Sequence, residues 1–81
     1  MKLILKLNHK VKFKLEYVME VDDLELLETV NDYQRRSDEP TFNTLDDIPE
    51  ALMIEALDEA NYIEDEINDY MMIEDIKISK L

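Results

Sequence analysis

Residues 1–21 read MKLILKLNHKVKFKLEYVMEV, and the alternation of apolar and polar side chains in this stretch decides the fold class. Leu3, Leu5 and Leu7 alternate with polar or mixed neighbours, and the longer series 11–21 does the same. A period of two places successive side chains on opposite faces of a strand. The stretch therefore predicts two half-buried β-strands.

The turn between these strands is expected at residues 8–10. A three-residue loop keeps the apolar side chains on one face, whereas a two-residue loop would set Leu5 against Lys12. We therefore expect the longer loop. It places Lys6 opposite Lys12, a like-charge pair, so we expect that face of the sheet to be solvated or neutralised by the chain's own acids, and not to be a basic binding patch. The expected cross-strand pairs are Leu7 with Val11, Leu5 with Phe13 and Leu3 with Leu15.

A first helix is expected after the two strands. Asp22 followed by Glu25 resembles a capping arrangement and predicts a helix from about Asp23 to Arg36. Arg35 and Arg36 lie in its last turn, where cations suit the negative end of the helix dipole, so a capping role is favoured for them. The inward stripe is either Leu24, Leu27 and Val30, or Leu26, Val30 and Tyr33.

A second helix and a third strand follow a loop at residues 37–44, in which Phe42 is expected to tuck into the core. Asp47 ahead of Pro49 and Glu50 predicts the start of the helix. The segment Met72–Leu81 returns to β-branched residues, with Ile76 and Ile78 on one face and Asp75, Lys77 and Ser79 on the other. The apolar positions of the second helix recur every three or four residues: Ile48, Leu52, Ala56, Ala60, Ile63, Ile67 and Tyr70.

Together these patterns predict a single α+β domain over residues 1–81. Its element order is β-β-α-α-β, with two helices on one face of a small three-stranded sheet whose strand order stays open.

Charge is distributed unevenly along this chain. Residues 1–15 carry five Lys and no acid, whereas the segment between Arg36 and Lys77 carries fourteen carboxylates and no Lys or Arg. The net charge is −12 at pH 7. Such one-signed charge raises the energy of a compact state through self-repulsion, which favours a role against a positively charged partner.

Several kinds of chemistry lack their usual residues. The chain has no Cys and no Gly, so it offers no disulfide, no thiolate and no Gly-rich phosphate loop. His9, the one histidine, is expected to be an ordinary surface residue in a turn. We therefore expect no enzyme, no cofactor and no dedicated metal site. No apolar run approaches the ~20 residues of a membrane span, so we expect a soluble protein without membrane contact.

The acids of the second helix lie off its apolar stripe. Four residues of helix advance about 6 Å, which is comparable with the spacing of phosphates along one DNA strand. A solvating helix face would usually mix both signs of charge at helical spacing, and this one does not. The expected partner-binding residues are Asp46, Asp47, Glu55, Asp58, Glu59, Asp65, Glu66 and Asp69.

In size and in the acidic segment Asp46–Asp75, the chain resembles the small acidic proteins that bacteriophages use against host defences, including anti-CRISPR and anti-restriction proteins that mimic DNA. The resemblance implies an inhibitor that occupies the Lys- and Arg-lined nucleic-acid channel of a nuclease complex. Such a protein would act in the cytoplasm, the host's if it is phage-encoded, through a basic nucleic-acid-binding partner and without binding nucleic acid itself.

Two other classes stay open. An antitoxin-like or regulatory interaction module would use apolar contacts by Met53, Leu57, Met71 and Met72. A small enzyme would need a partner to supply the missing groups. The sequence leaves open whether the basic N-terminal hairpin and the acidic helix belong to one binding surface or to the two ends of a homodimer contact.

Overall fold

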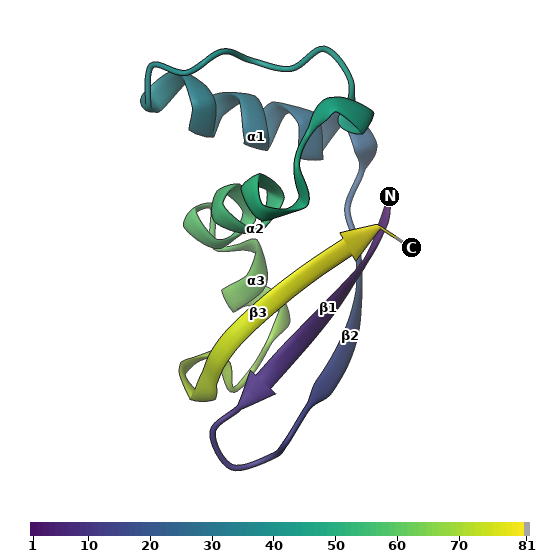
Figure 1. Ribbon diagram of the computed structural model, residues 1–81, viewed down its shortest axis with the longest axis vertical. Helices are drawn as coiled ribbons and strands as arrows, with labels where there is room; N and C mark the ends of the chain where they lie inside the picture. The colour runs from purple at the N-terminus through teal and green to yellow at the C-terminus, as the bar shows by residue number, and fades with distance from the viewer. Residues whose placement is uncertain (81) are drawn as a thin grey trace.

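The computed structural model describes residues 1–80 and shows a small α+β domain with a three-stranded antiparallel sheet, which confirms the expected fold class (Figure 1). The strand order, which the sequence left open, is β2-β1-β3. The elements are β1 (Lys2–His9), β2 (Leu15–Glu20), α1 (Asp23–Arg36), η1 (Leu45–Asp47), α2 (Glu50–Glu59), α3 (Tyr62–Glu66), η2 (Tyr70–Met72) and β3 (Ile73–Lys80), where η marks a 3₁₀ turn.

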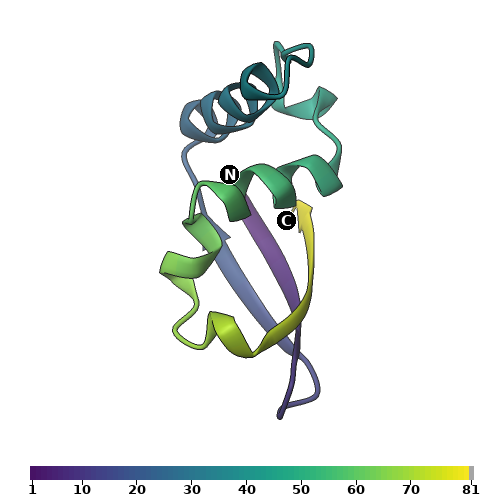
Figure 2. The ribbon, with the colours of Figure 1, turned by 90° about the vertical axis from the view of Figure 1, so that its left-hand side faces the viewer.

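The central strand β1 supplies the floor of the core. Leu3, Leu5 and Leu7 are buried on one face, and Met19 of β2 and Ile78 of β3 lie beside them on the same face. The helices gather on this side of the sheet, with α2 packed against β3 (Figures 1 and 2). Among residues 1–80, no helix covers the opposite face, which carries Lys2, Lys6, Lys77, Glu16, Glu20 and Asp75.

The expected register of the hairpin is wrong by four residues. Leu7 pairs with Leu15, Leu5 with Tyr17 and Leu3 with Met19. A shift of four keeps the apolar side chains that remain in the strands on their predicted face, so the hydrophobic pattern alone did not distinguish the two registers. The observed register sets Lys6 opposite Glu16 and Lys2 opposite Glu20, where the expected one set Lys6 opposite Lys12. Opposite charges at such positions contribute roughly 0.2–1 kcal/mol each, which favours the observed pairing.

The connection between β1 and β2 therefore spans residues 10–14. Val11 and Phe13, expected in the second strand, lie in this loop with strongly exposed side chains. They contribute nothing to the core of the domain.

Helix α1 forms where the sequence predicts it, with the Asp22 side chain accepting a hydrogen bond from the Glu25 backbone N–H at 3.2 Å. Leu26 and Val30 are buried, which confirms that part of the second proposed stripe, whereas Leu24 is exposed. The helix packs mainly on α2 and lies beyond the end of the sheet (Figure 1).

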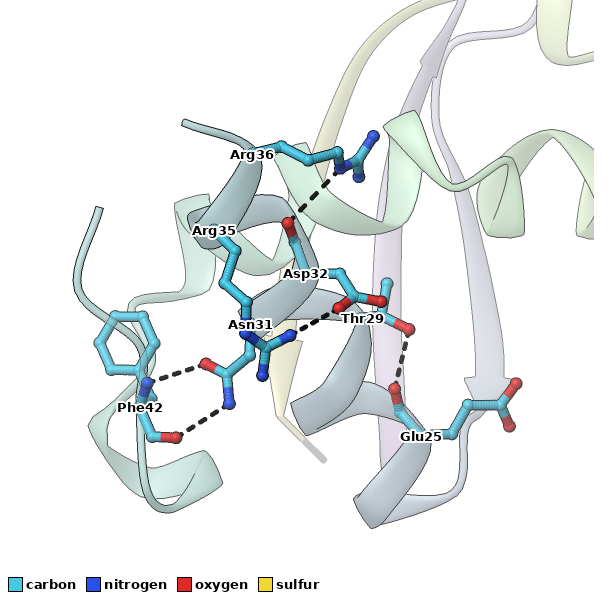
Figure 3. Close-up of polar contacts among 7 residues, drawn as sticks. All are labelled: Glu25, Thr29, Asn31, Asp32, Arg35, Arg36 and Phe42. Carbon is cyan, nitrogen blue, oxygen red and sulfur yellow. Dashed lines mark hydrogen bonds and ion pairs between the residues drawn. The ribbon is translucent and has the colours of Figure 1, made fainter. Parts of the chain in front are cut away.

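Two buried polar side chains of α1 hold the following loop. Asn31 donates to the Phe42 carbonyl at 3.0 Å and accepts from the Phe42 N–H at 2.8 Å (Figure 3). Gln34 donates to the Pro40 carbonyl at 2.9 Å. The loop is thereby fastened to α1, and Phe42 is half-buried against the core as expected.

The second helical region is interrupted, which corrects the expectation of one helix running to Tyr70. Asn61 adopts a left-handed conformation with φ of 66°, and it separates α2 from α3. The apolar period continues across the break, because Ile63 and Ile67 are buried like Ala56 and Leu57. Burial of that stripe therefore does not need a continuous helix.

The break at Asn61 can be tested with two substitutions. In the left-handed region a Cβ atom costs roughly 1–2 kcal/mol, which Gly avoids. We expect the Asn61→Gly protein to be more stable than the Asn61→Ala protein by about 1 kcal/mol. In a continuous helix Gly is about 1 kcal/mol less favourable than Ala, so the order would reverse. Urea unfolding of both variants measures the difference.

Candidate functional site: an acidic helical surface

The eight expected partner-binding acids lie along the helical side of the molecule. Seven of them are exposed to solvent and Asp69 is half-buried. The chain changes direction between α2 and α3 (Figure 2), so the acids follow a bent path. Asp46 and Asp47 lie in η1, Glu55, Asp58 and Glu59 on α2, Asp65 and Glu66 on α3, and Asp69 just before η2.

Each of the three expected partner-binding acids on α2 has a partner from another element. The Tyr33 hydroxyl donates to Glu55 at 3.2 Å, and the Tyr70 hydroxyl donates to Asp58. Arg36 forms an ion pair with Glu59 at 2.7 Å across the α1–α2 interface. Both groups of that pair are about half exposed, so its contribution to stability is small. It does neutralise part of the negative field of α2.

The carboxylate partners raise the pKa values of the Tyr33 and Tyr70 hydroxyls. The hydrogen bond to Asp58 is the main reason that the pKa of Tyr70 rises to about 12, with partial burial adding to the effect. The hydrogen bond to Glu55 likewise raises the pKa of Tyr33. A phenol with a raised pKa remains a hydrogen-bond donor near neutral pH. Tyr33 and Tyr70 therefore orient Glu55 and Asp58 without removing their negative charge.

His9 is buried at the end of β1, which corrects the expectation of an ordinary surface histidine. Its Nδ1 accepts the backbone N–H groups of Val11 and Lys12 at 3.1 and 3.2 Å, so Nε2 is the nitrogen that donates to Asp69 at 2.7 Å. The ring thus links the hairpin loop to the turn after α3.

The hydrogen bond from His9 is also the main cause of the lowered pKa of Asp69. A carboxyl group whose pKa is lower in the folded than in the unfolded state stabilises the fold above its unfolded pKa. That contribution is lost as the pH falls through the lowered folded value. Asp69 therefore has a structural function in addition to any contact with a partner.

Three of the eight acids have no hydrogen-bond or ion-pair partner in the described part of the chain. Within residues 1–80, the side chains of Asp46, Asp65 and Glu66 form no hydrogen bond or ion pair, whereas Thr44 donates to Asp47 at 3.1 Å. Asp65 and Glu66 are adjacent on α3, while Asp46 lies in η1, which contacts α1. The strongest unneutralised part of the surface is therefore α3.

The residues that organise this surface could not be recognised from the sequence, because they are distant in sequence from the acids they contact. Arg36 and Glu59 are 23 positions apart, and His9 and Asp69 are 60 apart. Helical spacing signals such as i to i+4 pairs cannot reveal contacts of this kind. The aromatic residues near the acids were the one available hint, because a Tyr beside buried apolar surface needs a partner for its hydroxyl.

The apolar set of the interaction-module alternative divides in two. Met53 and Leu57 are fully buried in the core, so they are not accessible to a partner. Met71 is 80% exposed and Met72 37% exposed. Met71 borders an open groove together with Ile54, Asp58 and Tyr70.

No family model, curated protein or solved structure matches this chain. In the part of the chain that the structure describes, no three acidic or histidine side chains converge in a way that could hold a metal ion. No helix between residues 1 and 80 has the length and apolar character required to cross a membrane. The function must therefore be argued from the charge and geometry of the acidic helical surface itself.

Replacing His9 tests its structural role. The His9→Ala protein loses a buried ring with three polar contacts, one of them to a carboxylate, and we expect its free energy of unfolding to fall by about 1–3 kcal/mol. Asn8→Ala changes an exposed neighbour on the same strand and should alter stability by less than about 0.5 kcal/mol. Equal stability of the two variants in chemical denaturation would contradict this role.

The Tyr70–Asp58 contact predicts an unusual titration. We expect the Tyr70 ring to stay mostly protonated at pH 11, because its pKa is about 12. Asp58→Asn removes the charged acceptor and should move the pKa of Tyr70 toward the ordinary value of about 10. Asp65→Asn removes an equal charge elsewhere and serves as the control. Ring carbon shifts followed by NMR report the titration, and identical curves for both variants would exclude the contact.

Proposed function

We propose that this protein binds a basic nucleic-acid-binding site by presenting carboxylates where the site normally holds phosphates. The observation that supports this proposal is the uninterrupted run of negative charge. Fourteen carboxylates lie between Arg36 and Lys77 without one Lys or Arg, and those on α2 and α3 are exposed. Arg36 is the one Lys or Arg that pairs with an acid of this run within residues 1–80, and it reaches only Glu59.

The mechanism is competitive and electrostatic. Carboxylates replace phosphates against the Lys and Arg side chains of the partner, and the long-range field steers the encounter. Glu55 and Glu59 are four residues apart on α2, an advance of about 6 Å along the helix. Because Tyr33 and Tyr70 already orient Glu55 and Asp58, less side-chain entropy is lost when the partner binds.

The class of partner that fits best is the nucleic-acid channel of a host defence complex of the CRISPR-Cas or restriction type. The small size, the one-signed acidic surface and the lack of Cys and Gly suit an inhibitor that blocks such a channel without chemistry of its own. The protein would then act in the cytoplasm of the cell that contains the complex. The bent path of the acids through α2 and α3 suits a curved channel wall better than a flat surface.

The alternative function is an antitoxin-like or regulatory module that binds through apolar contacts. The observation that favours it is the exposure of Met71 beside the groove of Ile54, Asp58 and Tyr70. Such an interface would resist high salt, whereas phosphate mimicry would not.

Charge reversal on α3 tests the proposal. The protein is used as bait in bacterial lysate at low salt, followed by a salt gradient and identification of the eluted proteins. We expect a nucleic-acid-binding protein or nuclease complex that is released by moderate salt and displaced by competing duplex DNA. Asp65→Lys with Glu66→Lys should lower the affinity at least tenfold, about 1.4 kcal/mol, because each change replaces an attraction to the basic partner with a repulsion. The fold should not change, because neither acid forms a hydrogen bond or ion pair within residues 1–80.

The control carries the same change in net charge at exposed acids outside α2 and α3. Glu28→Lys with Glu39→Lys should retain the partner, since Glu28 lies on α1 and Glu39 in the following loop. Equal loss of binding in both double variants would mean that only net charge matters, and it would refute the proposal that a defined acidic surface binds the partner. A partner that resists salt and ignores DNA would favour the apolar module instead.

A further inference from the structure

The outer edge of β2 is open. Within residues 1–80, β2 pairs with β1 on one side and with no strand on the other. Exposed edges of this kind are usually blunted by Pro, by a bulge, by charged side chains or by a covering helix, because unpaired backbone groups can join another strand. β2 carries the charged side chains Glu16 and Glu20, which lie opposite Lys6 and Lys2 of β1. Pro is absent from β2, its pairing with β1 is regular, and α2 packs over β3 at the far side of the sheet.

The hydrogen-bond phase of the hairpin identifies which groups face outward. Met1 and Val21 exchange two backbone hydrogen bonds, at 2.9 and 2.6 Å. Hydrogen-bonded pairs alternate along an antiparallel ladder, so the pairs Leu3–Met19 and Leu5–Tyr17 are of the same type. The N–H and C=O groups of Glu16, Val18 and Glu20 therefore point away from β1 and are available to a further strand.

Exposed apolar side chains concentrate along the same edge and its two ends. Seven large hydrophobic residues of the described chain are strongly exposed, and five of them fall between residues 11 and 24. Tyr17 lies on the helix-side face of β2 and Val18 on the open face, so both faces of this edge strand carry uncovered apolar surface. The five are Val11 (74%), Phe13 (95%), Tyr17 (40%), Val18 (59%) and Leu24 (64%).

Charge differs in sign between the two ends of β2. The loop before the strand carries Lys10, Lys12 and Lys14. Glu20 ends the strand, and the segment after it carries Asp22, Asp23 and Glu25. Figure 1 shows the loop at one end of the sheet and the start of α1 at the other. A strand that is basic at one end and acidic at the other is complementary to a copy of itself laid antiparallel.

We propose that two copies of this chain associate through their β2 edges, antiparallel about a two-fold axis, to form one continuous six-stranded sheet. The basic loop of each copy then lies beside the acidic start of α1 in the other. This brings Phe13 toward Leu24 of the second copy and covers apolar surface that the monomer exposes. The inference does not rest on the proposed binding of a basic partner.

Charge and hydrogen-bond phase together select one register. Tyr17 opposite Tyr17 of the second copy places the outward backbone groups of Glu16 against those of Val18 and sets Lys14 opposite Glu20 twice. A shift of one step along the copy, with Val18 opposite Val18, would set Glu16 opposite Glu20 twice, a like-charge arrangement. The register centred on Tyr17 is therefore favoured.

The outer edge of β3 is a weaker candidate for the same association. Its pairing with β1 has an irregularity at Asn8 and His9, and none of its residues is among the strongly exposed large hydrophobic side chains. Because α2 packs on β3, copies joined at this edge would also bring two acidic helices together. Repulsion between two copies is therefore lower at the β2 edge, which lies beside the basic hairpin loop.

Cysteine cross-linking tests the register directly, since the natural chain has no Cys. Opposed residues in an antiparallel ladder have Cα atoms about 4.5–5.5 Å apart, within disulfide range, whereas residues two positions out of register exceed about 7 Å. We expect mild oxidation in 0.15 M salt to convert most of the Tyr17→Cys protein to a covalent dimer. Val18→Cys on the same edge should cross-link several-fold less. No cross-link at position 17, or a stronger one at position 18, would overturn the proposal.

A charge swap makes the test independent of oxidation. In sedimentation experiments the unmodified protein should change from monomer to dimer with increasing concentration. Lys14→Glu should weaken the dimer by roughly tenfold, because symmetry turns two pairs repulsive, and Lys14→Glu with Glu20→Lys should restore it. A protein that stays monomeric at millimolar concentration, or a double variant no better than the single one, would refute the β2 pairing and leave the edge to a strand of another protein.

Discussion

The structure depends on the burial of one face of β1. Leu3, Leu5 and Leu7 form the middle of the core, and every other layer is placed relative to them. β2 and β3 pair with the two sides of this strand, α2 packs on β3, and α1 packs on α2. A domain of this size buries only about 60% of its unfolded surface, so the small core must outweigh the self-repulsion of a net charge of −12. The acids are tolerated because they stay outside that core.

The same face explains how much of the fold the sequence could predict. Period-two alternation identified the three strands and their inward faces, although it extended the second strand into residues 11–14, which form a loop. The capping pattern at Asp22 placed α1 correctly. Leu81, the last residue of the expected third strand, lies outside the described residues. The register of the hairpin was not predictable from alternation, because a shift of four residues preserves every face. It depends on cross-strand charge pairs and on His9, whose ring accepts two N–H groups of the loop. The local pattern determined which face of each strand is buried, and tertiary contacts determined which residues pair across the hairpin.

The candidate site shows the same division. Its acids could be named from the sequence, since a run without Lys or Arg needs no structure to be seen. Which of these acids have intramolecular partners could not be predicted, because the partners lie on other elements. These partners are Tyr33, Arg36, Tyr70 and His9. Nor does the helical period reveal the break at Asn61, since Ile63 and Ile67 are buried on either geometry. The structure thus divides one expected acidic array into acids held by their own chain and acids left to solvent, chiefly on α3.

The polarity of the chain has a different meaning in three dimensions than along the sequence. Basic residues gather at the hairpin loop and many acids on the helices, so the molecule offers two kinds of electrostatic surface. At physiological ionic strength the screening length is about 8 Å, while the long dimension of the molecule is 39 Å. Charges far apart on the molecule therefore act largely independently, whereas the hairpin loop and the turn after α3 meet at the His9–Asp69 contact. A copy approaching β2 meets Lys10, Lys12 and Lys14, and a basic channel approaching α3 meets Asp65 and Glu66. The two proposed associations would use different elements, because the dimer would form at β2 and the basic partner would bind at α2 and α3.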